Sequence, residues 1–179
     1  MPHDLPDRID TTRLRLRPPD VGDARSIFDA YAQDSEVCRF MIWMPHASEA
    51  ATRDFVESCM AAWAADGRRP YVISERCSDP AIGMIEARLL GTTVDIGYVL
   101  ARSCWGKGLM PEAIDALAAT ALASPSIYRV QATCDTENIP SQRALQKSNF
   151  IREGRLERYA VHPNLSPEPR ACFMYARVR

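Results

Sequence analysis

The stretch Trp105-Gly106-Lys107-Gly108-Leu109-Met110-Pro111-Glu112-Ala113 lies directly after a predicted strand and directly before a predicted helix. Two glycines one residue apart leave backbone N–H groups uncovered, and these groups converge with the helix N-terminus. Pro111 in the first helical turn removes no donor that the helix needs. The stretch therefore predicts a concave anion site, although a tight turn into a helix uses glycine in the same way. It is neither a P-loop nor a dinucleotide fingerprint, because neither motif's glycine spacing is present.

A second polar segment, Asp135-Thr136-Glu137-Asn138-Ile139-Pro140-Ser141, follows the predicted strand 128–134. Pro140 favours a helix start, so Asn138 and Ser141 are expected in the first turn of a short helix. Each residue can simply cap or begin the helix, or it can reach into the cleft above the strand. The spacing leaves both interpretations open.

The hydrophobic pattern divides the rest of the chain into strands and helices. Strict alternation predicts a strand at 13–17, and two helices are expected after Asp20 and after Ser48. The second helix carries apolar residues on one stripe that we expect to be buried: Phe55, Val56, Cys59, Met60 and Trp63. From Pro70 the period becomes two, which predicts an antiparallel meander of strands at 71–73, 81–87 and 93–100. A helix, a strand, a short helix and two closing strands follow.

The resulting order is β-α-α-β-β-β-α-β-α-β-β, an α/β (α+β) arrangement and not a doubly wound Rossmann sheet. We expect a mixed, mostly antiparallel central sheet of about six or seven strands flanked by about four helices. Residues 1–10, with two prolines and alternating charges, are expected to be a loose lead-in. Residues 11–179 are expected to form a single domain.

Composition narrows the function classes. The 179 residues include 22 Lys and Arg against 23 Asp and Glu, a formal net charge of −1, which disfavours a broadly cationic nucleic-acid surface. No run approaches the roughly 18 apolar residues of a membrane span, and the N-terminus is polar, so we expect a cytoplasmic protein that needs no membrane. The six cysteines contain no C-x-x-C pair and are expected to be reduced core residues. The three isolated histidines predict no metal site.

Together, these motifs resemble the GNAT N-acetyltransferases, and more narrowly the RimJ/RimL-like branch that acetylates N-termini of ribosomal proteins. The resemblance rests on an ordered set of motifs from about residue 11 to residue 178: Thr12-Arg13-Leu14-Arg15-Leu16-Arg17, Met44-Pro45-His46, Ile96-Gly97-Tyr98, Trp105-Gly106-Lys107-Gly108, Glu112-Ala113, Glu137-Asn138 with Ser141, Phe150 and Glu153-Gly154. Each motif alone is weak, but their order is specific.

The resemblance implies an acetyl-CoA co-substrate held in a gap between two splayed central strands, here those ending at Leu100 and Cys134. Pantetheine would pair with the backbone around Val99 and Leu100. The diphosphate would lie on backbone amides of the glycine loop, namely those of Trp105, Gly106, Lys107, Gly108, Leu109 and Met110. Asn138 would contact the cofactor arm, and Ser141 would support the departing thiolate.

The implied reaction is direct acyl transfer without a metal, in which a neutral amine attacks the thioester. The base is open: Asp95 and Glu86, on adjacent predicted strands, are the acids best placed to face the cleft, with or without a water between. Either can instead be a solvent-facing strand residue. Likewise, Lys107 can approach a phosphate or stay solvated. His46, beside Trp43, can help select the acceptor, although plain packing is favoured.

The chain departs from the family pattern in three ways. Ser103 replaces a Gln or Arg, and Leu109 and Met110 replace small residues that could otherwise line the cradle. Asn149 replaces the glycine before Phe150, a change that asparagine tolerates because it readily adopts left-handed geometry. None of these departures removes a group that the chemistry needs.

The acceptor amine is not determined by these motifs. The favoured acceptor is a protein or peptide N-terminal α-amine. The alternative is a small amine such as an aminoglycoside, a polyamine or an amino acid. A non-catalytic acyl-CoA-binding module is disfavoured by the presence of Asn138 and Ser141. We expect acetyl-CoA and the amine as partners, leave a homodimer open, and expect no nucleic acid.

Overall fold

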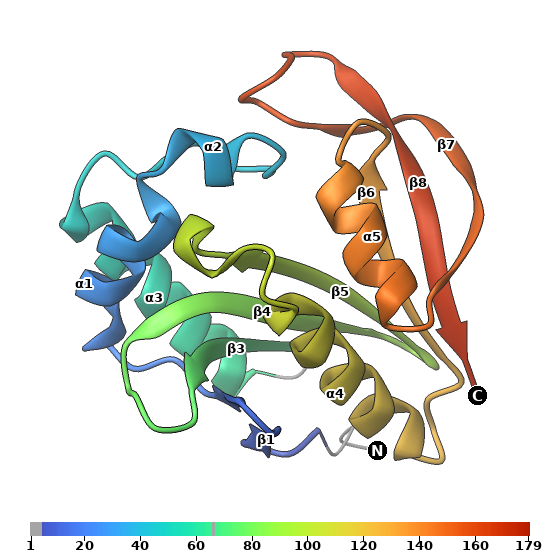
Figure 1. Ribbon diagram of the computed structural model, residues 1–179, viewed down its shortest axis with the longest axis horizontal. Helices are drawn as coiled ribbons and strands as arrows, with labels where there is room; N and C mark the ends of the chain where they lie inside the picture. The colour runs from blue at the N-terminus through green and yellow to red at the C-terminus, as the bar shows by residue number, and fades with distance from the viewer. Residues whose placement is uncertain (1–4, 66) are drawn as a thin grey trace.

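The computed structural model describes residues 5–65 and 67–179, which form an eight-stranded sheet with helices on both faces (Figure 1). Along the chain the elements are β1 (Ile9–Asp10), β2 (Leu14–Arg17), α1 (Asp23–Ile27), a π-helical turn (Phe28–Ala32), α2 (Ser35–Cys38), α3 (Glu49–Ala64), β3 (Arg68–Glu75), β4 (Ala81–Leu90), β5 (Thr93–Leu100), a 3₁₀ turn (Arg102–Cys104), α4 (Leu109–Ala123), β6 (Arg129–Asp135), α5 (Ile139–Lys147), β7 (Ile151–Val161) and β8 (Pro169–Val178).

The sheet is mixed and mostly antiparallel, as the sequence predicts. Its strand order is β1-β2-β3-β4-β5-β6-β8-β7, and β5 with β6 is the parallel pair. The β3–β4–β5 meander runs antiparallel, as the sequence predicts. The sequence-based count of six or seven strands is slightly low because the first two-residue strand carries no periodic signal.

The N-terminal segment is more ordered than expected. Ile9 and Asp10 pair with Leu16 and Arg15 as β1, and Leu5 is buried. The hydroxyl of Tyr71 donates to the carbonyl of Pro6 over 2.7 Å. The expectation of a loose lead-in over residues 1–10 is therefore wrong for this part, and its first four residues lie outside the described chain.

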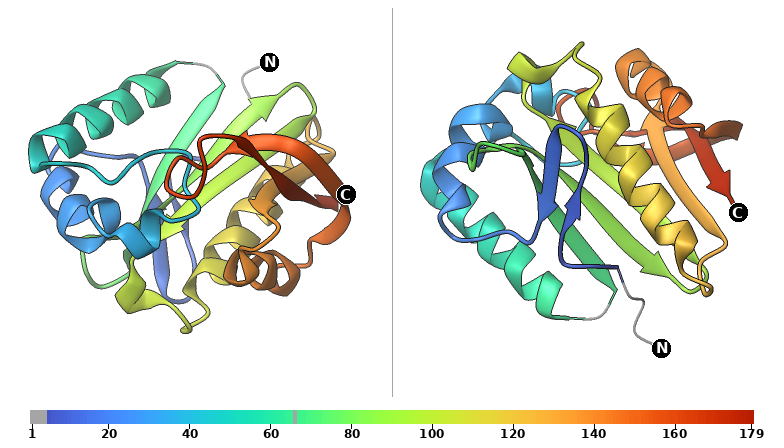
Figure 2. Two further views of the ribbon diagram at one scale, coloured as in Figure 1. Left: turned by 90° about the horizontal axis from the view of Figure 1, so that it is seen from above. Right: turned by 60° about the horizontal axis from the view of Figure 1, so that its bottom comes forward.

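Helices cover both faces of the sheet. In Figure 2, α1 and α3 lie on one side, and α4 and α5 lie on the other. Ser48 caps α3 by accepting from the Ala51 amide, as predicted. Val56 and Cys59 are buried, but Met60 is 38% exposed, so the predicted buried stripe of α3 is narrower than expected. Its N-cap and its three buried residues, Thr52, Val56 and Cys59, still fix the helix on the sheet.

A gap opens in the middle of the sheet where β5 and β6 part (Figure 1). The parallel pairing comprises three residue pairs and ends at Asp95 opposite Gln131. Beyond that point β5 continues to Leu100 beside β4, and β6 continues to Asp135 beside β8. The strands thus splay where the family resemblance led us to expect it.

Candidate active site

The exposed edge of β5 carries backbone groups into this gap. The Thr92 carbonyl accepts from Tyr128 on the β6 side, whereas the Ala101 amide donates to Ile82 on the β4 side. Because backbone groups alternate between the two edges of a strand, Tyr98 and Leu100 present their N–H and C=O groups to the gap. Val99 was predicted to contact pantetheine, but its own backbone groups pair with β4.

Trp105 is already hydrogen-bonded to one of the backbone groups that face the gap. Its indole Nε1 donates to the Leu100 carbonyl over 2.8 Å, while the residue stays 45% exposed. The carbonyl of Leu100 is therefore occupied by the protein itself. The groups left for a strand-like ligand are the Leu100 amide and both backbone groups of Tyr98.

The glycine loop begins where β5 ends, at the open end of the gap. Gly106 and Gly108 have φ values of 76° and 73°, which L side chains rarely adopt. Among the residues that the structure describes, none accepts from the amides of Gly106, Lys107 and Gly108. A Cβ added at Gly106 would meet no atom within 4 Å, so open space faces this backbone. These observations fit an anion-binding loop at the N-terminus of α4.

The Arg13 guanidinium donates hydrogen bonds to two carbonyls of this loop. Its Nη1 donates to the Lys107 carbonyl at 2.9 Å, and its Nη2 donates to the Gly108 carbonyl at 3.2 Å. A trans peptide points its C=O and N–H in opposite directions, so the amides of Gly108 and Leu109 face away from Arg13. Arg13 thereby orients two of the proposed phosphate donors. No local sequence pattern indicates this role, because Arg13 reaches a carbonyl 95 residues further along the chain.

Glu112 anchors Arg13 in turn. Its Oε1 accepts from the Thr11 hydroxyl at 2.6 Å and from the Arg13 amide at 2.9 Å, and its Oε2 accepts from Arg13 Nε at 2.6 Å. Partial burial raises the pKa of Glu112, but the hydrogen bonds from Thr11 and Arg13 outweigh it, and the net pKa is lowered. The Glu112 carboxylate therefore stays charged and fixes the N-terminal segment to α4.

The residues that depart from the family pattern do not crowd the loop. Leu109 and Met110 are 5% and 7% exposed, so their side chains lie in the core and leave only their amides at the surface. Ser103 and Lys107 are exposed. Asn149 has a φ of 62°, the left-handed geometry expected for it.

Asn138 and Ser141 lie together at the start of α5. Asn138 is the N-cap, and its Oδ1 accepts from the Ser141 amide at 3.2 Å. The capping interpretation is thus confirmed for Asn138. Its side-chain NH₂ has no acceptor among residues 5–65 and 67–179, so a second contact remains available to it.

The Ser141 hydroxyl is in contact with Tyr98 across the gap. Tyr98 Oη and Ser141 Oγ are 2.7 Å apart. Burial is the main cause that raises the pKa of Tyr98, so its phenol stays protonated. On the next strand along the chain, burial raises the pKa of the Cys134 thiol to about 12, against a smaller, opposite effect of Ser141. Sequence reasoning named Ser141 but missed Tyr98.

The two candidate bases lie on one face of the sheet, linked by arginines. Glu86 accepts from Arg68 and, at 3.3 Å, from Arg88, and Arg88 Nη2 donates to Asp95 at 2.5 Å. Gln131 on β6 donates to Asp95 at 3.4 Å. Both acids are thus close together at the closed end of the gap, because Asp95 is the last residue of β5 that pairs with β6. Side chains alternate along β5, so Tyr98 points to the opposite face.

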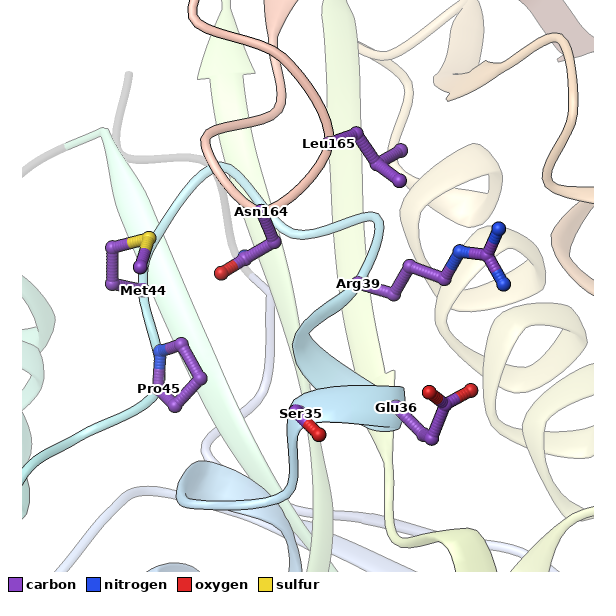
Figure 3. Close-up of a pocket in the computed structure, with 7 residues that line it drawn as sticks. All are labelled: Ser35, Glu36, Arg39, Met44, Pro45, Asn164 and Leu165. Atoms are coloured by element: carbon purple, nitrogen blue, oxygen red, sulfur yellow. The ribbon is translucent and has the colours of Figure 1, made fainter.

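A pocket of about 410 Å³ lies beyond the open end of the gap, between α2 and the β7–β8 connection (Figure 3). Arg39 and Glu36 of the α2 region project from its wall, and Met44, Pro45 and Leu165 add apolar surface. Asn164 links the β7–β8 connection to the α2 region, because its Nδ2 donates to the carbonyls of Cys38 at 2.7 Å and Trp43 at 2.8 Å.

His46 lies beside this pocket and packs against the protein. Its Nδ1 is 2.8 Å from the Thr52 hydroxyl, and its ring contacts Trp43 and Phe55. Burial lowers the pKa of His46, which favours the neutral ring. The structure thus supports the packing interpretation that the sequence analysis favoured.

Comparison with known proteins identifies the family of this chain. Residues 13–151 match the family model described as Acetyltransferase (GNAT) domain. The uncharacterized N-acetyltransferase p20 of Bacillus licheniformis is 29% identical over 152 residues, which cover 83% of this chain and 85% of that protein. A GNAT-family acetyltransferase structure from Bacillus anthracis is 26% identical, with a TM-score of 0.82 and coverage of 96% and 98% of the two chains.

The fold is also that of RimL, a ribosomal L7/L12 α-N-protein acetyltransferase solved in complex with coenzyme A in a disulfide with a cysteine. That structure has a TM-score of 0.83 at 21% identity and covers 96% of this chain and 97% of its own. The chain belongs to the GNAT acetyltransferases. It is therefore an acyltransferase of the N-acetylating type. Over the described residues, no helix has the length and apolar character to cross a membrane.

Proposed function

We propose that this enzyme transfers the acetyl group of acetyl-CoA directly to a primary amine, and that the leading acceptor is the N-terminal α-amine of a protein or peptide. One observation carries the proposal: the splayed β5–β6 edge opens beside a loop of unpaired amides. A thioester arm that carries a diphosphate needs both features in this order. RimL, which shares the fold, supports the cofactor because it binds coenzyme A.

The residues present fit this cofactor. Tyr98 and Leu100 would pair with the amides of pantetheine, and the amides from Gly106 to Met110 would hold the diphosphate. The positive end of the α4 dipole also attracts the negative charge of the diphosphate, so the site needs no cluster of basic side chains. Asn138 would contact the cofactor arm, and Ser141 would stand beside the sulfur.

Amine deprotonation is assigned to the acid pair Glu86 and Asp95. Both carboxylates are engaged by Arg88, so a proton would reach either one through water or after an arginine shifts. They lie on the face of the sheet opposite to Tyr98. The acids would therefore act on the amine from one face, and Tyr98 and Ser141 would act on the leaving sulfur from the other. The free thiols of all six cysteines agree with a cytoplasmic enzyme.

The pocket at Arg39 and Glu36 supports an acceptor larger than a simple amine. It presents two charges and an apolar wall next to the open end of the gap, which suits the first residues of a polypeptide. The likeness to RimL favours the same class. A small amine remains the second candidate, because a pocket of this volume also holds a compact ligand.

The test is thiol release from acetyl-CoA with a panel of N-terminal peptides and a matched panel of small amines. We expect turnover with peptides, and mass spectrometry should place the acetyl group on the α-amine. Turnover with small amines alone would move the assignment to the second candidate. Tight binding of coenzyme A without turnover would indicate a binding module, and failure to bind coenzyme A would overturn the proposal.

A further inference from the structure

A pair of hydroxyls joins the two sides of the gap. The Tyr98 phenol comes from β5, and Ser141 comes from the first turn of α5. The phenol has one proton to donate, and it has two candidate acceptors on Ser141: Oγ at 2.7 Å and the carbonyl oxygen at 3.4 Å. The shorter contact has the length of a good O–H···O hydrogen bond. We assign the phenol as its donor and Oγ as its acceptor, because a phenol is the more acidic of the two hydroxyls. The Ser141 hydroxyl hydrogen is then free for another partner.

A protein sulfur also lies near Ser141. Cys134 is on β6, and Ser141 lowers the pKa of its thiol against the larger, opposite effect of burial. This residue is 6% exposed, and its raised pKa keeps it a neutral thiol. Ser141 thus has a hydrogen-bonded phenol beside it and a neutral thiol in its surroundings.

We propose that Tyr98 is a positioning residue for acyl transfer, whose hydroxyl donates to Ser141 Oγ and so directs the Ser141 hydrogen toward the sulfur of departing coenzyme A. This inference rests on the proposed function and deepens it. In the transfer, the amine nitrogen bonds to the acetyl carbon, the carbon–sulfur bond breaks, and sulfur leaves with the electron pair. The amine proton leaves to the base, and both hydroxyls keep their protons.

Tyr98 is expected to affect the rate of transfer because its hydrogen bond is energetically coupled to the one that Ser141 makes to sulfur. A hydroxyl that accepts a hydrogen bond becomes a stronger donor, so Tyr98 strengthens the Ser141 contact to a thiolate. Without Tyr98, the Ser141 hydroxyl can rotate, and its donation is no longer fixed at the sulfur. The charge on sulfur develops only during transfer, so the loss should fall on kcat and spare cofactor binding.

The experiment compares Tyr98→Phe, Ser141→Ala and the double variant with the wild-type enzyme. Tyr98→Phe should lower kcat about tenfold and leave the KM for acetyl-CoA nearly unchanged. The double variant should be no slower than Ser141→Ala, because Tyr98 acts through Ser141. Losses that multiply in the double variant, or an unchanged kcat in Tyr98→Phe, would overturn the proposal.

Tyr71→Phe is the matched control. Tyr71 lies in the same cross-strand row, since Ile85 pairs with both tyrosines, but its hydroxyl donates to Pro6. This variant loses the same kind of hydroxyl and should keep its kcat. A drop in kcat equal to that of Tyr98→Phe would show a general packing effect and contradict the assignment.

A second measurement, the thiol pKa of bound coenzyme A, does not need an amine substrate. The ultraviolet absorbance of the thiolate reports the thiol pKa of bound coenzyme A. That pKa should be lower in the wild-type complex than in Tyr98→Phe or Ser141→Ala. If no amine is acetylated, the proposed function fails while this titration still tests Tyr98. Equal thiol pKa values in all three proteins would reject the positioning role.

Discussion

Gly106 shows how a single backbone angle shapes the candidate diphosphate site. Its φ of 76° turns the loop so that amides face open space rather than protein acceptors. The sequence analysis identified this residue from the spacing of two glycines. The chemical consequence is that an anion can be held by N–H groups in a chain whose net charge is close to zero.

We predict that Gly106→Asp abolishes binding of coenzyme A, because it places a carboxylate in the space meant for the diphosphate. Gly91→Asp is the control, since Gly91 also has a positive φ, of 63°, and a Cβ there also meets nothing within 4 Å. Both variants bear the same backbone strain, but Gly91 lies in the β4–β5 turn. Calorimetric titration with coenzyme A should separate them. Equal affinities would disprove the loop assignment.

Gly83 is the residue most constrained by its neighbours. A Cβ there would lie 2.5 Å from the Val99 carbonyl and 3.3 Å from the Leu100 Cα. We predict that Gly83→Ala lowers the free energy of unfolding by about 1–3 kcal/mol through overpacking. It should also weaken acetyl-CoA binding, because it displaces the end of β5. Chemical denaturation and titration measure the two effects, and an unchanged stability would contradict the observed packing.

Arg13 connects β2 with the glycine loop and with α4, so it joins two elements that the sheet alone would leave independent. Its guanidinium contacts two loop carbonyls and the Glu112 carboxylate. The alternating motif predicted the strand correctly. It carried no signal that one of its three arginines has a role different from the others.

We predict that Arg13→Gln weakens coenzyme A binding about tenfold, because the loop carbonyls lose their donors and the amides lose their fixed direction. Arg15→Gln is the matched control on the same strand, where Arg15 contacts Asp10 at 3.3 Å. Both substitutions remove one positive charge. Affinity measured by titration should fall for Arg13→Gln only. An equal fall in both variants would indicate a long-range charge effect and not orientation of the loop.

At the scale of the whole molecule, Asp135 at the end of β6 links this strand to β8 and to the segment that leads into α5. This carboxylate is fully buried and accepts from Arg170 Nε at 2.6 Å and from the Glu137 amide at 2.9 Å. Burial raises the pKa of Asp135, but these donors outweigh it, and the net pKa lies below its usual range. Its stabilising contribution is therefore present above the unfolded pKa of about 4 and is lost as the pH falls through the folded value.

We predict that Arg170→Gln lowers the free energy of unfolding by about 3–5 kcal/mol at neutral pH, because it leaves a buried charge unpaired. The difference from the wild type should shrink on acidification, as Asp135 becomes protonated. Arg155→Gln is the control, since the exposed Arg155–Glu157 pair should contribute about 1 kcal/mol at most. Denaturation at several pH values measures both. A difference that does not depend on pH would contradict the role of Asp135.

Most elements of the fold could be predicted because their signals are local. Ser48, Asn138 and the alternation in β2 and β5 each mark an element through its own neighbours. The two-residue strand β1 and the exposure of Met60 were missed, since both depend on which distant surface covers them. In the same way, the sequence placed Glu86 and Asp95 near a cleft but contained nothing to show that Arg88 joins them.

By itself, the sequence determined the order of strands and helices, the position of the glycine loop and the family, because periodicity and motif spacing are contained within short stretches. Only the tertiary structure decided where β5 leaves β6, which backbone groups face the gap, and which side chains meet across it. Arg13 reaches Gly108 over 95 residues, and Tyr98 reaches Ser141 over 43. Such contacts are set by strand register and helix placement, and no local pattern encodes them.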